Sequence, residues 1–562
     1  MKYVGARYMP KFLGTYDVTQ VYEALSVVDN GMGTTYVSNQ PVPAGTPLTN
    51  TDYWAVYGAS SAAIIQLQND VAALKHVILN PRDFGAACDR NIDDSAAIQD
   101  MFDFALTNGI TKVSFDGINE ISFKNAEIKS DVDIDFSTCK FYGVAGTDLR
   151  IYNMFTVDDP DIDISIKGGE FIGRGGNSPS TNASIETNAP LIDISNAHSV
   201  KISGGYFHNI NNTNEGVDAS TPMANRYGAL FRIHDTNFTS ITDNIIDKCY
   251  GSELIFIIDV TYDREDIDAE FKNNVVSDTT TTALDFIGNN IEVTGNKYVY
   301  DYNGSAVNCM GLNVYVHDEV IDGIFNNAYD NCESTSFQGD NVIIENVIIK
   351  EVTYFARMSA HNVRVSNISI KQLGNHSTVI GHLEVGYGTS PTVHKDIATS
   401  EISGVTYTIE NCDMRDLDGD AFFFLYGRPA MTEPPLINIK NCISSKVSTN
   451  TRYAALVVAN GCDVKVSDCI IYTRYVNGFS GTTSCGLFIQ NDAVMNSLTV
   501  KGCDYINPFN TAGHDCIFIA AGSSAFNVPV ISMGIIADST LAAAAHLAAM
   551  TNVVEAALIG LS

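Results

Sequence analysis

Apolar and polar residues alternate with a period of two through most of this chain, from about residue 112 to about residue 530. Stretches such as 290–296, 341–346 and 362–367 open with asparagine, continue with β-branched residues at alternate positions and end in small polar residues. A period of two predicts β-strands with one buried face. Helical periodicity is almost absent from the same region. Because crossover helices are missing, the pattern argues against a TIM barrel or a doubly wound sheet.

The strand pattern recurs along the chain at irregular intervals. Repeat asparagines at Asn290, Asn313, Asn341 and Asn362 are 23, 28 and 21 residues apart. Short parallel strands without helices satisfy their hydrogen bonds by stacking coil on coil, with loops of variable length between them. The sequence therefore predicts an all-β fold, a right-handed parallel β-helix. Pairs that end in cysteine, at 411–412, 441–442, 468–469 and 502–503, are expected at the turns, with the cysteine filling the interior.

Other segments are predicted to precede and follow this solenoid. Residues 1–58 form a small aromatic β module, and residues 59–80 form a short neck. The neck has apolar residues at 3-4-3-4 spacing, which favours a coiled coil over an amphipathic helix lying on its own domain. Its apolar positions are Ile64, Leu67, Val71, Leu74 and Ile78. Residues 81–111 lead into the β-helix, which is expected over 112–525, and a C-terminal cap with an alanine-rich run is expected over 526–562.

Charge and composition narrow the range of partners. The chain has 33 Lys and Arg against 65 Asp and Glu, a formal net charge of −32. A field of that sign repels nucleic acid and anionic membrane surfaces, so neither is expected as a partner. No run of 18 apolar residues suggests a membrane span, and no apolar secretory signal is seen at the start. If the protein works outside a cell, release by lysis as part of a virion is the expected route.

The sequence predicts neither a metal site nor a cofactor. Twelve cysteines lie singly between Cys88 and Cys516, without the paired Cys or His spacing of a zinc site, and no calcium-binding loop occurs. Most of the cysteines are expected to be small buried hydrophobes in a chain that folds in a reducing cytosol.

A row of candidate functional residues emerges when the strands are aligned. The positions five residues before the repeat asparagines are Asp285, Asn308, Ser336 and Arg357, all polar between apolar neighbours. Equivalent positions of successive coils stack about 4.8 Å apart, so these side chains should form a polar column on the outside of the helix. The same outer face is expected to include Glu253 on the coil before, and His382 and Glu384 on the coil after.

Two kinds of catalysis fit this face. Glycoside hydrolysis needs a pair of carboxylates, and Asp285 and Glu253 are the candidates on neighbouring coils. β-Elimination needs a cation and a base, and Arg357, His382 and Glu384 are candidates for that chemistry. Asn308, Ser336, Tyr387, Tyr426 and Arg428 are expected to contact sugar rings. For each of these residues the alternative is an ordinary solvated surface side chain or a loop contact.

The segment 83–89, followed by 93–99, resembles the entry motif of pectate-lyase-like β-helix proteins. The resemblance implies a capping helix over about 94–107, with Asp93 or Asp94 as its N-cap. Cys88 and Arg90 stand where that family usually has glycine.

The order of module, short coiled coil, capping motif and β-helix is similar to that of phage tailspikes. The resemblance implies a homotrimer in the virion, attached to tail or baseplate proteins and acting at the host cell surface. It further implies that the chain recognises and depolymerises a bacterial surface polysaccharide, with hydrolysis favoured. A polysaccharide lyase, a purely adhesive receptor-binding protein and a free bacterial pectate-lyase-like enzyme are the alternatives.

Overall fold

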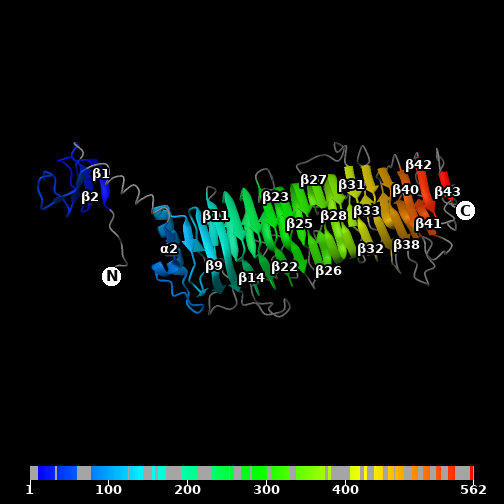
Figure 1. Cartoon of the computed structure of the whole chain (residues 1–562), viewed down its shortest axis with the longest axis horizontal. Helices are drawn as coiled ribbons and strands as arrows, with labels where there is room; N and C mark the ends of the chain where they lie inside the picture. The colour runs from blue at the N-terminus through cyan, green and yellow to red at the C-terminus, as the bar shows by residue number, and fades with distance from the viewer. Residues whose placement is uncertain are drawn as a thin grey trace, which may run out of the picture. The chain divides into compact units, whose positions relative to one another are not determined.

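In the computed structural model, 37 strands are hydrogen-bonded into a single sheet that winds into a right-handed parallel β-helix (Figure 1). This confirms the predicted fold class. The structure describes residues 10–31, 34–59, 77–124, 126–142, 155–158, 162–172, 191–212, 230–251, 253–258, 267–278, 282–299, 306–329, 337–373, 378–380, 406–417, 423–426, 436–446, 454–460, 463–473, 484–490, 498–506, 514–519, 530–537 and 557–560. No helix in these ranges is both long and apolar enough to cross a bilayer.

A small sheet forms separately near the N-terminus. Its strands, in spatial order, are β1 (Lys11–Thr15), β2 (Ser26–Asp29), β3 (Thr34–Ser38) and β4 (Trp54–Ala59). Tyr22 and Trp54 are buried with Val28 and Val42, and Tyr16 packs against both aromatic rings. The aromatic residues that stood out in the sequence therefore form the core of this sheet.

Each turn of the β-helix has three walls, named here in the order in which the chain runs through them. The first wall contains β8 (Ala126–Glu127), β10 (Phe155–Asp158), β12 (Ile192–Ser195), β16 (Phe231–His234), β20 (Glu253–Ile258), β30 (Thr378–Ile380), β33 (Phe423–Tyr426), β36 (Ala454–Asn460), β39 (Ser484–Gln490) and β41 (His514–Ile519). The second wall contains β13 (Ser199–Ser203), β17 (Phe238–Thr242), β21 (Asp268–Lys272), β31 (Thr406–Glu410), β34 (Leu436–Lys440) and β37 (Asp463–Ser467).

The third wall contains β7 (Glu120–Ile121), β14 (Tyr206–His208), β18 (Ile245–Asp247), β22 (Val275–Ser277), β24 (Lys297–Val299), β26 (Val320–Tyr329), β29 (Ser369–Leu373), β32 (Asp413–Leu417), β35 (Ile443–Lys446) and β38 (Ile470–Thr473). Several strands bend from one wall into the next: β9 (Val132–Tyr142), β11 (Asp163–Ile172), β23 (Thr282–Thr294), β25 (Val307–His317), β27 (Phe337–Glu345), β28 (Ile348–Ser366), β40 (Leu498–Ile506) and β42 (Val530–Ala537). The remaining elements are β5 (Ile78–Leu79), 3₁₀ helix η1 (Pro81–Phe84), β6 (Lys112–Ser114), β15 (Asn211–Asn212), β19 (Tyr250–Gly251) and β43 (Ala557–Gly560).

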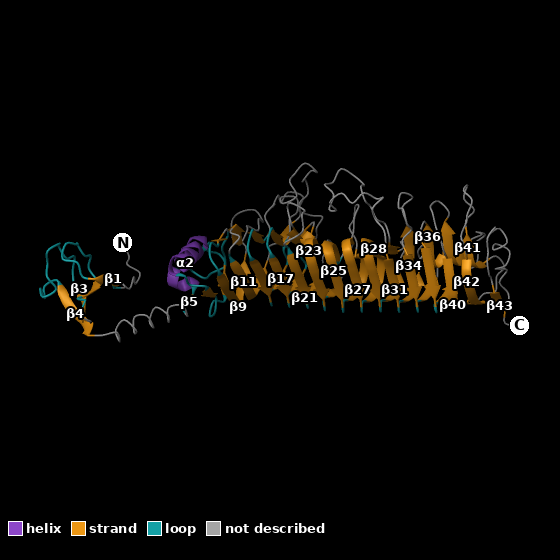
Figure 2. Ribbon diagram, turned by 90° about the horizontal axis from the view of Figure 1, so that it is seen from above, coloured by secondary structure: helices purple, strands orange, loops and turns teal. Residues whose placement is uncertain are grey.

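A helix lies at the N-terminal end of the β-helix, as the entry motif predicts (Figure 2). Helix α2 (Ser95–Asn108) buries Ile98, Met101, Phe102 and Ala105. Asp94 directly precedes the helix, and its backbone oxygen accepts a hydrogen bond from Ile98 N at 3.0 Å, as predicted for an N-cap residue. Its carboxylate accepts hydrogen bonds from the backbone N–H groups of Ala87 and Cys88, at 2.6 and 2.9 Å, and so holds the preceding loop. Cys88 has a φ of 54°, the left-handed conformation that explains why glycine is usual at this position.

Two further predictions lie outside the described residues: the coiled-coil positions 64–74 and the alanine-rich run 541–547. The fifth predicted coiled-coil position, Ile78, is described, and it begins strand β5 and does not belong to a helix. Part of the predicted C-terminal cap is described. There, β42 and β43 continue the parallel sheet.

The corner between the second and third walls explains the Asn and Cys repeats. At this corner a residue with positive φ recurs from coil to coil, as at Asn411, Asn441 and Asp468, and the next residue points into the core. The exposed asparagines stack, with Asn441 Nδ2 donating to Asn411 Oδ1 at 2.7 Å. The cysteines that follow these three residues and Gly502 are fully or almost fully buried, as predicted: Cys412, Cys442, Cys469 and Cys503.

In the middle of the solenoid the same interior position is occupied by polar residues: Asn244, Asn274, Asn296 and Glu319, all fully or almost fully buried. Each asparagine bonds both to the next side chain and to a backbone carbonyl. Asn274 Nδ2, for example, donates to Asn296 Oδ1 and to Ile241 O, at 3.0 and 2.9 Å. The row ends at Glu319, whose Oε1 accepts from Asn296 N and Nδ2 at 3.0 and 2.9 Å. These residues are called the interior ladder below.

Glu319 should make the stability of the protein depend on pH. Burial raises the pKa of Glu319 to about 8, well above its ordinary 4.5. Between these two values the folded chain holds a proton that the unfolded chain lacks. Stability from this group is therefore fully present below pH 4.5 and is lost as the pH rises through about 8, by at most about 1.4 kcal/mol per pH unit. Glu319→Gln keeps the acceptor oxygen without the titration.

We expect the unfolding midpoint in urea to fall less between pH 5 and pH 9 in Glu319→Gln than in the unmodified protein. Comparing the two proteins removes the pH dependence contributed by all other groups. An identical fall in both would show that Glu319 does not titrate in this range.

Candidate functional site

The polar column predicted on the outside of the first wall is present in the backbone register. Asp285 pairs with Asn308, and Phe256 lies opposite Asp285 on the preceding coil. Further on, Met310 pairs with Gln338, and Gln338 pairs with Ser359. Arg357 and Asn308 each lie two residues before the ends of this series, so Arg357 is in line with Asn308 two coils away. The alignment that was counted from the repeat asparagines is therefore correct for the residues that the structure describes.

The column points away from the core, but it is not solvated as the sequence predicted. Leu284 and Phe286, on either side of Asp285, are fully buried on the core side of β23. Asp285 therefore faces the opposite way, yet only 7% of it is exposed, and Asn308 is equally covered. Ala283 and Ile287, which flank Asp285 two residues away on either side, are fully buried as well.

Burial changes the acid–base behaviour of Asp285. It raises the pKa of this carboxyl from 3.8 to about 7. Asn308 Nδ2 donates a hydrogen bond to Asp285 Oδ1 at 3.0 Å. A carboxylic acid that keeps its proton near neutral pH and lies on the outer side of a strand has the properties required of a general acid.

The column extends on the other side of Phe256 to residues that the sequence analysis missed. Arg232 pairs in register with Phe256 and with Asp193. Its guanidinium holds the Asp193 carboxylate at two points, with Nε 2.9 Å from Oδ1 and a second bond from the terminal nitrogen to Oδ2. Counting five residues back from the looser repeat at Ser199 gives Ile194, which is buried on the opposite face of the strand, so the count misses Asp193 by one residue.

Beyond Arg357 the column continues at Val379 on β30, which pairs with Arg357. The segment 381–385, which was expected to carry His382 and Glu384 on this coil, lies outside the described residues. The column then continues through apolar residues, Phe424, Val458, Phe488 and Phe518. From Asp193 to Arg357 the column is polar except at Phe256 and spans six coil steps, roughly 29 Å at the usual strand spacing.

Glu253 lies on the coil next to Asp285, as predicted, but three residues away along the strand. It pairs with Thr282, which separates its Cα atom from that of Asp285 by roughly 11 Å. The next two residues of the strand, Leu254 and Ile255, are both buried. The structure describes the backbone, but not the side chains, of Glu253, Arg357 and Tyr426. Ser336, His382, Glu384, Tyr387 and Arg428 lie outside the described residues.

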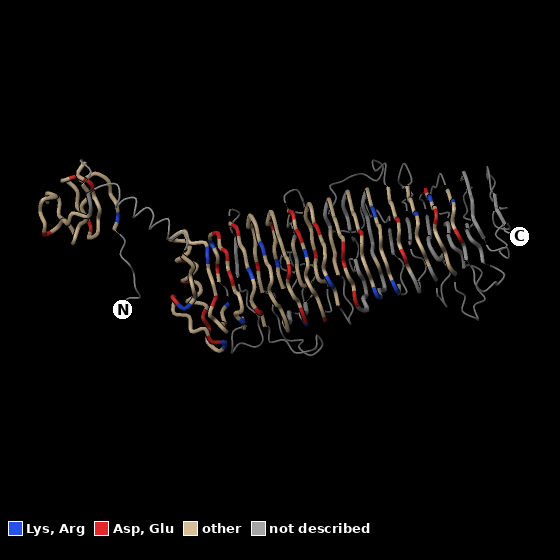
Figure 3. Tube along the Cα trace, in the orientation of Figure 1, with Lys and Arg blue, Asp and Glu red and all other residues tan. Residues whose placement is uncertain are grey.

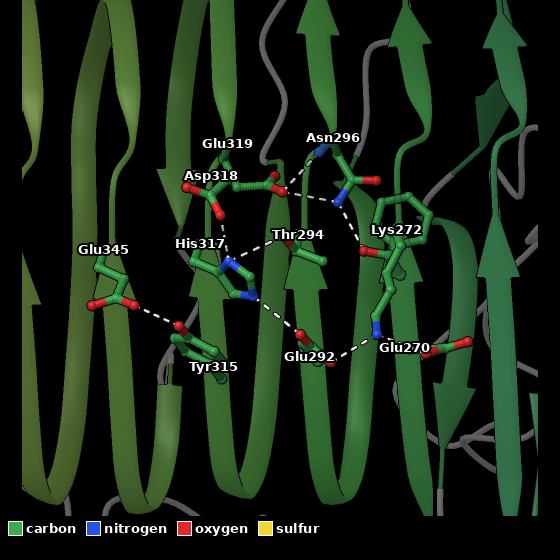
Figure 4. Close-up of polar contacts among 11 residues, drawn as sticks. Glu270, Lys272, Glu292, Thr294, Asn296, Tyr315, His317, Asp318, Glu319 and Glu345 are labelled. Carbon is green, nitrogen blue, oxygen red and sulfur yellow. Dashed lines mark hydrogen bonds and ion pairs between the residues drawn. The ribbon is translucent and has the colours of Figure 1, made fainter.

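A second polar cluster, not anticipated from the sequence, lies on the outside of the second wall (Figure 4). Lys272 Nζ lies 2.8 Å from both Glu270 Oε2 and Glu292 Oε2, and His317 Nε2 lies 3.1 Å from Glu292 Oε1. Hydrogen bonds from Lys272 and His317 lower the pKa of Glu292. This carboxylate stays ionised at neutral pH and is unsuited to donating a proton. We interpret the cluster as a clamp between three coils.

His317 completes this clamp. Burial lowers the pKa of His317, but its hydrogen bonds to Asp318 and Glu292 together outweigh burial and hold the pKa above the ordinary value. Tyr315 stacks on the imidazole with ring centres 4.2 Å apart, and its hydroxyl donates to Glu345. Basic residues are scattered among acidic ones along the described coils and form no continuous band in Figure 3. No cluster of metal-binding side chains occurs in the part of the chain that the structure describes.

Several solved structures are similar to this chain in fold. Tailspike protein 3 of bacteriophage CBA120 shares 11% identity over 92% of this chain and 78% of its own, with a TM-score of 0.39. A mutant tailspike of E. coli bacteriophage HK620, in complex with a hexasaccharide, shares 13% identity over 86% of this chain and 78% of its own, with a TM-score of 0.33. The A-module of an Azotobacter vinelandii mannuronan C-5 epimerase shares 11% identity over 82% of this chain and 98% of its own, with a TM-score of 0.23. No protein-family model matches the chain, and neither does any curated protein.

Proposed function

We propose that this chain is a phage tailspike that recognises a bacterial surface polysaccharide and cleaves it by glycoside hydrolysis on the first wall. The observation that carries the proposal is Asp285. It is an outward-facing carboxyl with a pKa near 7, placed in a polar column long enough to run beside several sugars. An acid of this kind protonates the glycosidic oxygen as the bond to the anomeric carbon breaks.

Glu253 is proposed as the second carboxylate. Its backbone lies one coil from Asp285, and the Cα separation of roughly 11 Å favours the wider carboxyl spacing of an inverting enzyme, about 6.5–9.5 Å, over the roughly 5 Å of a retaining one. In that arrangement Glu253 takes a proton from a water molecule as the water attacks the anomeric carbon. Asp285 gives its proton to the departing oxygen, which leaves as a hydroxyl.

The direct test of the proposal is depolymerisation by the purified protein. Surface polysaccharides from a panel of bacteria are incubated with it, and chain length is followed by size-exclusion chromatography. Shortening of at least one polysaccharide is expected. Binding without shortening of any would favour the adhesive alternative, and products that absorb in the ultraviolet would favour elimination.

The pKa of Asp285 predicts how the activity varies with pH. The acid works only while it holds its proton, so kcat/KM should fall about tenfold per pH unit above pH 7. Initial rates of reducing-end formation between pH 5 and pH 9 measure this limb. A rate that stays constant to pH 9 would exclude Asp285 as the acid.

We also propose that the chain acts as a homotrimer, docked through the third wall. Ile245 and Ile348 are 46% and 59% exposed, the two most exposed large apolar side chains among the described strands of the three walls. Both stand in one outward column of the third wall, with Val275, Lys297 and Val320 between them. A strip that is apolar at four of its five positions favours association with another protein surface. Light scattering should give three times the chain mass of 60.8 kDa, whereas the mass of one chain would contradict the proposal.

A further inference from the structure

Asn308 has an oxygen atom with no hydrogen-bond partner among the described residues, although the residue is 93% buried. Its nitrogen is used, since Nδ2 donates to Asp285 Oδ1 at 3.0 Å. Its Oδ1 is buried and accepts no hydrogen bond. Buried amide oxygens in folded proteins are nearly always paired, so an orphan beside a candidate acid calls for a donor from elsewhere.

We infer that Asn308 both positions Asp285 and selects the substrate, by presenting Oδ1 as an acceptor for an N–H or O–H donor on an uncharged sugar beside the cleaved bond. This inference rests on the proposed function. The nitrogen and the oxygen of the Asn308 amide have different roles. Nδ2 occupies Oδ1 of Asp285 and leaves Oδ2 to carry the transferable proton, while the amide oxygen lies on the side away from Asp285.

The charge of the column favours an uncharged sugar. Burial raises the pKa of Asp285 to about 7, so this carboxyl is uncharged below that pH, and the positive charge of Arg232 is balanced by Asp193, which it holds at two points. Among the described residues of this column, Arg357 is the one other cation, and its backbone lies two coils away from Asn308. A uronate carboxylate at Asn308 would bring its oxygens against the amide oxygen, so repulsion would replace a hydrogen bond.

The size of the effect follows from the cost of leaving a buried acceptor without a donor. A substrate that lacks the donor should react roughly tenfold to a hundredfold more slowly in kcat/KM. Two sugar groups supply suitable donors, a ring hydroxyl and the N–H of an acetamido group. They are distinguished by two sets of oligosaccharides cut from the polysaccharide that the protein shortens. In one set a single hydroxyl beside the cleaved bond is replaced by hydrogen, and in the other the acetamido nitrogen is methylated.

The test compares these sets on the unmodified protein and on two variants. The unmodified protein should lose rate on one set. Asn308→Leu should be slower overall and should no longer distinguish that set from the parent oligosaccharide. Asn308→Asp keeps an acceptor oxygen but loses the donor to Asp285 and adds a neighbouring carboxyl, so it should keep the preference and move the alkaline limb of kcat/KM to higher pH.

Asn341→Leu on the exposed face of the second wall is the matched control and should change neither property. Unfolding midpoints confirm that the variants are folded. The inference is overturned if Asn308→Leu keeps both the preference and the pH limb of the unmodified protein while Asp285→Asn is inactive. In that case the proposed function stands. If the unmodified protein shortens no polysaccharide, both fail together.

Discussion

Asp285→Asn is expected to lower kcat by a factor of about 10² to 10⁴ while binding of the polysaccharide stays within about threefold. The substitution keeps the size of the side chain but removes the proton that the departing oxygen needs, and general acid catalysis is worth about that factor. The substitution also removes the titrating carboxyl, whose pKa is raised by burial. Rates from reducing-end formation and affinities from titration calorimetry separate the two effects.

The control is Asp133→Asn on β9, an exposed aspartate for which the structure shows no hydrogen bond. It makes the same chemical change on a solvated part of the β-helix and should leave the rate unchanged. A fall in kcat of less than about tenfold in Asp285→Asn would remove this residue from the mechanism. A loss of binding together with rate would assign it to recognition.

Asn274→Ala is expected to destabilise the protein by about 3–6 kcal/mol. Asn274 is fully buried in the interior ladder and bonds to the side chains of Asn244 and Asn296 and to Ile241 O. Removing it leaves several buried donors and acceptors unpaired, each at a cost of about 1–3 kcal/mol. The ladder joins successive coils, so the loss should appear as an earlier unfolding midpoint in guanidinium chloride.

A matched substitution among the exposed, stacked asparagines of the second wall separates the effect of burial from the effect of stacking. Asn341 also stacks between two asparagines, accepting from Asn362 and donating to Asn313, but it is exposed to water. Asn341→Ala should therefore cost less than about 1 kcal/mol, because water replaces the lost partners. Equal losses in the free energy of unfolding in the two variants would mean that the interior ladder contributes no more to the stability of the β-helix than the exposed asparagines do.

The fold was predictable from the sequence because strand period and corner chemistry are local. Alternation gave the strands, and the asparagines and cysteines marked corners whose residues indeed adopt left-handed backbone conformations, as at Asn411 and Asn441. Counting from the repeat asparagines aligned Asp285 with Asn308 because one continuous strand runs through both the first and the second wall in each of these coils, β23 and β25. Within such a strand no loop intervenes to change the count.

The site was only partly predictable because it depends on contacts between distant segments. Alternation gave the outward direction of Asp285 but not its burial, which comes from what covers the wall. After Arg357 the described column continues at Val379, and the predicted residues His382 and Glu384 lie outside the described residues. The Lys272 and His317 clamp was missed because its members come from three coils, and no local motif marks them.

The central claim is that Asp285 drives hydrolysis of a polysaccharide on the first wall. Digestion in water labelled with heavy oxygen, followed by mass spectrometry of the products, tests it most directly. We predict that each new reducing end carries one labelled oxygen atom with the unmodified protein, and that Asp285→Asn forms no such ends. Products without the label, or labelled products at an undiminished rate from Asp285→Asn, would contradict the claim.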